Sequence, residues 1–200
     1  MGSKCHAVQV KHIGEMQRMI VEESSGKNHY RKSALYVDWS TISGRINSVK
    51  ISNRDEEGRE INHEITIEGT NGIISRALVA LSQALEKIKS IEEAWESGTK
   101  QEMAKLEKET GSHVTYNPRL FSKEETPEFP LPEYGLKVRR SRYEIAPIVF
   151  IVKGTEKEDT ATEPPFRIEV EGEGGFVYIS IVNIQPLVDE LMEISQLPSL

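Results

Sequence analysis

The fold depends most on residues 61–95, which read INHEITIEGTNGIISRALVALSQALEKIKSIEEAW. At the start of this stretch isoleucines and His63 alternate with polar residues, which predicts a half-buried strand from Ile61 to Ile67. Residues 69–72 (GTNG) interrupt the alternation. After them, apolar residues recur at helical spacing and form one stripe: Ile74, Ala77, Leu78, Leu81, Leu85, Ile88, Ile91 and Trp95. We therefore expect a strand followed directly by a long amphipathic helix.

The sequence before this stretch predicts one short helix and two strands. Ile13, Met16, Met19 and Ile20 recur at helical spacing and are followed by a polar stop at residues 24–26 (SSG). Residues 33–40 (SALYVDWS) and 43–52 (SGRINSVKIS) are rich in aromatic and β-branched residues, which favour strands. The polar residues 53–60 then suit a hairpin connection to the strand that begins at Ile61.

The sequence after residue 95 predicts a second strand-rich region. The long helix ends at Gly98, with a separate helical piece at residues 100–110, or the two form one kinked rod. Residues 145–152 are almost continuously apolar, as in a buried strand, and residues 166–184 suit a hairpin that turns at 172–175 (GEGG). A final helix is expected to begin at Pro186, because proline suits the first turn of a helix.

These predicted elements define an α+β fold. Because the strands come in adjacent runs, we expect an antiparallel or mixed sheet packed on the one long amphipathic helix, with a C-terminal hairpin and helix, in a single domain of residues 1–200. Residues 1–12 are expected to form a flexible N-terminal tip. Prolines at 118, 127, 130 and 132 disfavour a long helix or a central strand, so residues 112–143 are expected to form an irregular proline-containing arm.

Composition restricts the classes of function. The 200 residues carry a net charge of −7, which disfavours general binding of nucleic acid. With Cys5 as its one cysteine, the chain forms no internal disulfide and offers no thiolate zinc cluster. No apolar run approaches the roughly 18 residues that cross a bilayer, and no secretory signal is evident. A cytoplasmic protein fits these observations.

The predicted arm contains a candidate partner-binding peptide. Residues 129–134 read FPLPEY, and the prolines stiffen the chain so that its apolar and aromatic side chains can be presented to a groove. The peptide resembles the proline–tyrosine peptides that viral matrix proteins and other adaptors offer to their partners. The residues assigned to partner binding are Phe129, Pro130, Leu131, Pro132 and Tyr134. In the alternative interpretation Phe129, Leu131 and Tyr134 only pin the arm to the body of the protein.

A basic segment follows the peptide. The cations of residues 137–143 (KVRRSRY) lie beside a tyrosine, a pattern that suits a phosphate backbone or an anionic lipid headgroup. The residues assigned to anion binding are Lys137, Arg139, Arg140 and Arg142. Alternatively, the segment is a solvated loop that balances nearby glutamates.

The N-terminus is a candidate for lipidation. Removal of Met1 would expose Gly2 for myristoylation, and Cys5 would suit a second acyl chain, so that a membrane surface becomes a partner. Against this, His6 stands where the motif has serine or threonine, and Met-Gly-Ser is also a common cloning remnant. Cys5, His6 and His12 provide too few ligands for a metal site. His63 is expected to be a hydrogen-bonded histidine of the core or the sheet rather than a catalytic base.

The sequence contains no recognisable catalytic, metal or cofactor signature. We therefore expect a non-enzymatic interaction or assembly protein, matrix-like or adaptor, which uses the arm to contact a protein partner or another copy of itself. The alternatives are an accessory protein that binds nucleic acid through residues 137–143, and an enzyme whose site is assembled from residues distant in sequence.

Overall fold

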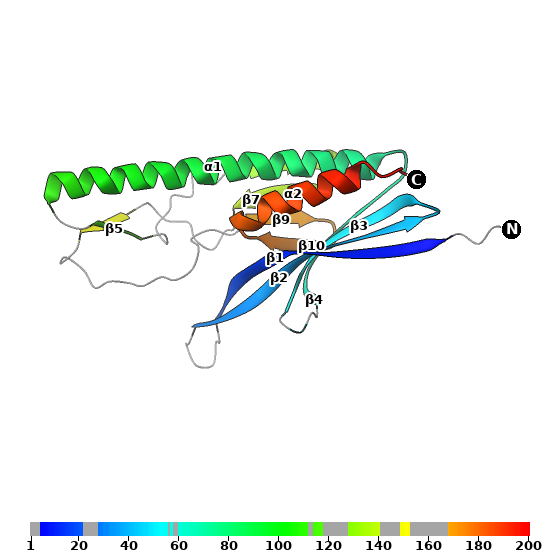
Figure 1. The fold of residues 1–200 in the computed structure, drawn as a ribbon, viewed down its shortest axis with the longest axis horizontal. Coiled ribbons are helices and arrows are strands. Elements are labelled where there is room, and N and C mark those ends of the chain that lie inside the picture. Colours follow the sequence, from blue (N-terminus) through cyan, green and yellow to red (C-terminus); the bar gives the residue numbers. More distant parts are fainter. Residues whose placement is uncertain are drawn as a thin grey trace.

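The first sheet is a meander of four long antiparallel strands. In the computed structural model, which describes residues 5–21, 28–55, 57, 60–111, 114–117, 128–140, 149–152 and 168–200, this sheet has the order β1-β2-β3-β4. Its strands are β1 (His6–Val21), β2 (Asn28–Ile42), β3 (Arg45–Arg54) and β4 (Glu60–Glu68). Sequence neighbours are thus neighbours in space, and β1 lies at the edge of the sheet (Figure 1).

The second half of the chain builds a second sheet and a small accessory sheet. The second sheet has the order β10-β9-β7-β6, and all its neighbouring strands are antiparallel. Its strands are β6 (Glu128–Leu131), β7 (Leu136–Arg140), β9 (Ile168–Gly172) and β10 (Gly175–Ile179), with the 3₁₀ turn η2 (Pro132–Tyr134) between β6 and β7. The accessory sheet pairs β5 (Val114–Asn117) with β8 (Val149–Val152).

Two helices cover the sheets. The long helix α1 (Ile73–Thr110) runs through Gly98 without a break and ends at Gly111, whose N–H donates to the carbonyl of Glu107. The second helix, α2 (Ile181–Ser195), packs alongside the N-terminal half of α1, and the C-terminal half of α1 reaches past the large sheets to β5 (Figure 1). The predicted α+β class is therefore confirmed, and of the two interpretations of α1 the continuous rod is correct.

The core lies between the helices and the inner faces of both large sheets. The apolar stripe of α1 is buried at every position from Ile74 to Ile88, as the sequence predicted. It packs in one cluster with Leu35, Val37 and Ile51 of the first sheet, with Val138 and Val170 of the second, and with α2. One helix face therefore organises two sheets that share no strand.

The two large sheets are joined by a side-chain amide that makes the two hydrogen bonds a neighbouring strand would make. The side-chain amide of Asn53 in β3 donates to the carbonyl oxygen of Tyr178 in β10 and accepts from the Tyr178 N–H, both at 2.9 Å. Nearby, a Cβ on Gly175 would lie 2.7 Å from the carbonyl oxygen of Glu64, so only glycine lets the backbone of β10 approach β4 this closely. The second sheet thus docks against the β3–β4 side of the first.

The predicted helix over residues 13–20 is wrong, because these residues belong to β1. The ladder between β1 and β2 has a β-bulge between His12 and Gly14, which adds one residue to β1. A bulge lets residues three apart face the same side of a strand, and here Ile13 is half-buried against the core and Met16 is buried. The bulge therefore gives Ile13 and Met16 the three-residue separation that is typical of one face of a helix. The expected flexible tip is likewise corrected from His6 onward, while residues 1–4 lie outside the described part.

The predicted irregular arm is also corrected where the structure describes it. Residues 128–140 form β6, η2 and β7, and β7 is an interior strand between β6 and β9. The prolines remain in positions that proline tolerates, since Pro130 lies on the edge strand β6 and Pro132 opens η2. Strand β7 contains no proline, so the prolines on its N-terminal side did not exclude it. Pro118 and Pro127 lie outside the described residues.

The final helix starts five residues earlier than predicted, at Ile181, which places Pro186 inside α2. Proline cannot donate to the carbonyl of the residue four positions before it, Val182. Both Pro186 and Val182 lie on the exposed side of α2, and the Val182 side chain is 71% exposed. Water can therefore replace the missing hydrogen bond, which explains why the helix tolerates this proline.

We predict that the side-chain amide of Asn53 stabilises the docking of the two sheets. Asn53→Leu should lower the free energy of unfolding by about 2–4 kcal/mol, because the Tyr178 N–H and carbonyl would both lose their partner in a buried place. The measurement is urea denaturation followed by circular dichroism. Asn53→Ala serves as the control for volume. If Asn53→Leu restored most of the stability that Asn53→Ala loses, packing and not hydrogen bonding would explain the role of Asn53.

Candidate functional site

The N-terminal half of β1 is an exposed edge. The side chains of residues 6–12 are all exposed, including Val8 at 60% and Val10 at 53%. β1 pairs with β2 on one side, and among the described strands none pairs with its other side. An open strand edge with apolar side chains is a template for the addition of another strand. We call the open side of residues 6–12 the β1 free edge.

The direction of the backbone groups along the free edge follows from the ladder with β2. The carbonyl of Cys5 accepts from the N–H of Ser43 at 2.8 Å, and the register pairs each residue of 6–12 with one residue of β2 without a break. In an antiparallel ladder, hydrogen-bonded and non-hydrogen-bonded pairs alternate. Since Cys5 faces β2, residues 7, 9 and 11 also face β2. The N–H and C=O groups of His6, Val8, Val10 and His12 consequently point to the free edge.

Helix α2 anchors β1 beside the bulge. The side-chain amide of Asn183 donates to the carbonyl oxygen of Glu15 at 3.1 Å. The contact requires glycine at position 14, because a Cβ there would lie only 2.1 Å from Oδ1 of Asn183. Together with the ladder to β2, this contact holds β1 in an extended conformation. The free edge is thus preformed and pays little ordering entropy on binding.

The face of the first sheet that points away from the helices carries a polar array. The ring of Tyr36 lies 5.1 Å from the ring of His12, centroid to centroid, and the guanidinium carbon of Arg54 lies 4.2 Å above the centroid of Tyr36. Arg54 also donates to Oδ2 of Asp38 at 2.7 Å. The charge of Arg54 is thus already balanced, so the array offers no uncompensated cation to an anionic ligand.

A cavity of about 590 Å³ opens at one end of this array. Its lining has charges of both signs, from Glu15, Lys32, Asp55 and Glu57, beside the rings of His12 and Tyr36. Within this lining Lys32 Nζ lies 3.7 Å from Oε2 of Glu15. The mixed charges suit contact with a polar ligand. Over the whole described part of the chain, no group of three or more histidine, cysteine, aspartate or glutamate side chains is arranged to hold a metal ion.

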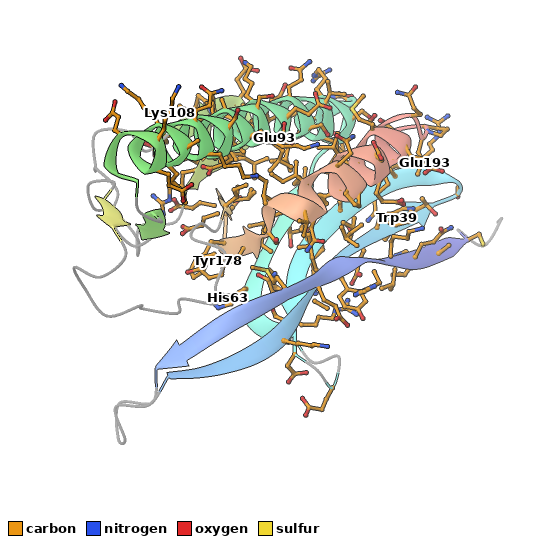
Figure 2. The ribbon with its side chains drawn as sticks, turned by 60° about the vertical axis from the view of Figure 1, so that its left-hand side comes forward. Trp39, His63, Glu93, Lys108, Tyr178 and Glu193 are labelled. Atoms are coloured by element: carbon orange, nitrogen blue, oxygen red, sulfur yellow. The ribbon has the colours of Figure 1, made fainter. Side chains whose placement is uncertain are left out.

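His63 lies in an aromatic cluster at the junction of the two sheets. Its ring centroid is 4.7 Å from that of Phe176 and 5.4 Å from that of Tyr178. Figure 2 shows His63 and Tyr178 close together where β4 meets β10. These contacts agree with the prediction of a histidine that belongs to the packing of the sheets.

The predicted partner-binding peptide packs on the body of the protein. Phe129, Leu131 and Tyr134 are half-buried against the core, and Phe129 lies beside α1 near Lys87 and Ile91. Pro130 and Pro132 are exposed. This arrangement favours the alternative interpretation, in which the three large side chains pin the segment to the protein.

The predicted anion-binding cations that the structure describes are engaged with carboxylates. The ammonium nitrogen of Lys137 lies 2.9 Å from Glu128, and Arg139, which is 9% exposed, lies 2.6 Å from Glu169 and 3.3 Å from Glu171. Burial opposes the charge of Arg139, but the hydrogen bond to Glu169 and the neighbouring carboxylates outweigh it and raise the pKa of Arg139. Arg139 is therefore a structural cation. The side chain of Arg140 and all of Arg142 lie outside the described residues.

The predicted lipidation residues, Gly2 and Cys5, precede β1, whereas His6 and His12, which the sequence disfavours as metal ligands, lie in β1. Gly2 is outside the described residues, and Cys5 is exposed immediately before the strand. His6 and His12 occupy the two ends of the free edge, six residues apart on an extended strand. The prediction missed Val8 and Val10. The alternation of apolar and polar residues in AVQVK, residues 7–11, was a signal that could have found them.

Comparison with family models, curated protein sequences and solved structures finds no significant match to this chain. Within the described residues, neither helix combines the length and the hydropathy required to cross a bilayer.

We predict that Arg139 stabilises the fold through its ion pair with Glu169, instead of serving as a phosphate-binding residue. Arg139→Met should lower the free energy of unfolding by about 3–5 kcal/mol, because it leaves Glu169, which is 5% exposed, without its counter-charge. Adding Glu169→Leu should recover most of this loss. The measurement is urea denaturation of the single and double variants.

Lys137→Met is the matched control on the same strand. Its ion pair with Glu128 is solvent-exposed, so the loss should stay below about 1 kcal/mol. Equal losses for Arg139→Met and Lys137→Met, or no recovery in the double variant, would contradict the structural role of Arg139.

Proposed function

We propose that this protein is a non-enzymatic assembly protein that binds another protein chain by strand addition at the β1 free edge. The observation that carries the proposal is the open edge of residues 6–12, with exposed valines at positions 8 and 10. Four residues direct backbone donors and acceptors outward there, and each backbone hydrogen bond contributes about 0.5–1.5 kcal/mol. Burial of the valines adds apolar surface to the same contact.

The lack of protection on this edge supports the proposal. Proteins usually block an open edge with proline, a charge, a bulge or a covering segment. Residues 6–12 have no proline and no acidic residue, their one lysine or arginine is Lys11, and the bulge follows His12. In the second sheet, by contrast, edge strand β6 carries Glu128 and Pro130, and edge strand β10 packs against β4. Among the described large-sheet edges, the β1 free edge is therefore the one best suited to pair with a partner.

The proposal keeps the class of function that the sequence suggested and moves the contact surface. The surface is now the β1 free edge instead of the peptide at residues 129–134, whose large side chains are turned to the core. The nucleic-acid alternative loses one of its cations, because Arg139 is buried among carboxylates.

The proposal predicts that β1 contacts another polypeptide in the cell. A photoreactive benzophenone amino acid in place of Val8, in full-length chain made in its own cells, should give covalent adducts larger than the chain. Adding Val10→Pro should suppress the adducts. The N–H of Val10 points to the free edge, so proline removes a donor to the partner strand and no hydrogen bond to β2. The adducts are detected by denaturing electrophoresis and mass spectrometry.

The control places the same photoreactive residue at Val182 of α2, a valine that is more exposed than Val8 and does not belong to the free edge. An adduct with another copy of this chain and an adduct with a different protein both support the proposal. Equal yields at positions 8 and 182, or no adduct at position 8, would refute strand addition at β1.

A further inference from the structure

We infer that the strand added to β1 is the β1 strand of a second copy of this protein, antiparallel to the first and related to it by a two-fold axis at Gln9. This inference rests on the proposed function and names its partner. The product is one continuous antiparallel sheet of eight strands, made of two copies of the β1-β2-β3-β4 meander.

The first argument is the symmetry of the free edge itself. The unbulged part of β1 runs from His6 to His12, because the ladder shifts between His12 and Gly14, and the midpoint of this segment is Gln9. The outward-facing residues 6, 8, 10 and 12 are also symmetric about position 9. In an antiparallel pair centred there, residue 8 faces residue 10 of the other copy and residue 6 faces residue 12. All four outward N–H groups and all four outward carbonyls of each copy then meet a partner.

The second argument is the side chains that this register brings together. Val8 of each copy faces Val10 of the other, on the same side of the sheet, so four exposed valines cover one another. Lys11 faces Ala7, so the two lysines lie at opposite ends of the contact and like charges are not paired. Residues 6–12 contain no acidic residue that would compete for another arrangement.

Neighbouring registers satisfy fewer of these conditions. In the register centred at Val10, Val8 lies opposite His12. In the register centred at Val8, Val10 lies opposite His6. In each of these registers one of the two valines loses its contact with a valine of the other copy. Registers between them place outward backbone groups opposite inward ones and break the hydrogen-bond ladder. The centre at Gln9 is therefore the arrangement in which backbone, apolar side chains and charges all agree.

The third argument is closure. A two-fold contact uses the same edge of both copies, so the assembly stops at two and no open β1 free edge remains. The inner face of each half stays covered by its own helices, and the polar arrays around Tyr36 lie on one common outer face of the joined sheet.

Disulfide trapping tests the register. In full-length chain with Cys5→Ser, Gln9→Cys should form an intermolecular disulfide on mild oxidation. The two residues would be a non-hydrogen-bonded pair with Cα atoms about 4.5 Å apart, within the range of about 4.4–6.8 Å for disulfides. The matched control is Ala7→Cys on the same strand and the same face of the sheet, which should not link to itself. Ala7→Cys mixed with Lys11→Cys should link again, because these positions face each other.

Replacing the valines with charged residues tests the valine contact without forming a covalent bond. Val10→Asp should raise the dissociation constant of the dimer by about tenfold or more, measured by light scattering over a concentration series, because an acid would face Val8 at both ends. The double variant Val8→Lys with Val10→Asp should restore dimers, since opposite charges then face each other across the axis. Circular dichroism checks that each variant is folded.

Each outcome decides the inference. Dimers that link through Gln9→Cys and recover in the double variant support it. A disulfide at Ala7→Cys but not at Gln9→Cys would show another register and overturn it, and a monomer at about 100 μM would overturn the second copy as partner. In the monomer case the photoreactive residue at Val8 separates the two proposals: adducts with a different protein keep the proposed function, whereas their absence refutes both.

Discussion

Burial of one face of α1 is the constraint on which the rest of the structure depends. The stripe from Ile74 to Ile88 is wholly buried, and its cover comes from several of the described elements together. Residues of the first sheet, of the second sheet and of α2 all pack against this stripe in one hydrophobic cluster. Because the same helix face needs all three, they are held at fixed positions around it, although the two large sheets share no strand.

This arrangement also decides which sheet edges stay open. On the β4 side of the first sheet, the side-chain amide of Asn53 pairs with the backbone of Tyr178, and Gly175 approaches the carbonyl of Glu64. That side is therefore occupied by the second sheet. On the opposite side, Asn183 of α2 contacts β1 beside the bulge. Residues 6–12, on the N-terminal side of the bulge, remain an exposed edge. The proposed function depends on this exposed edge.

The charged residues show how the fold redefines a sequence pattern. In the sequence, Arg139 belongs to a run of cations that resembles a binding site for phosphate. In the sheet, its neighbours are Glu169 across one ladder and Glu128 across the other, and the guanidinium is buried among carboxylates. Glu169 lies 30 residues further along the chain, so the pairing is invisible to any analysis of local charge. Cross-strand neighbours, rather than sequence neighbours, determine what this arginine does.

The sequence by itself determined β4 and α1, because the alternation from Ile61 to Ile67 and the stripe from Ile74 to Ile91 depend only on local geometry. It also determined the α+β class and the C-terminal hairpin. Tertiary structure alone decided that residues 6–21 form a strand, since the bulge places Ile13 and Met16, three residues apart, on the same side of β1. It decided as well that β7 is an interior strand. It also decided the candidate site. The alternation at Val8 and Val10 is present in the sequence, but whether a strand is an edge depends on which other strands lie beside it, and those contacts join residues far apart in the chain.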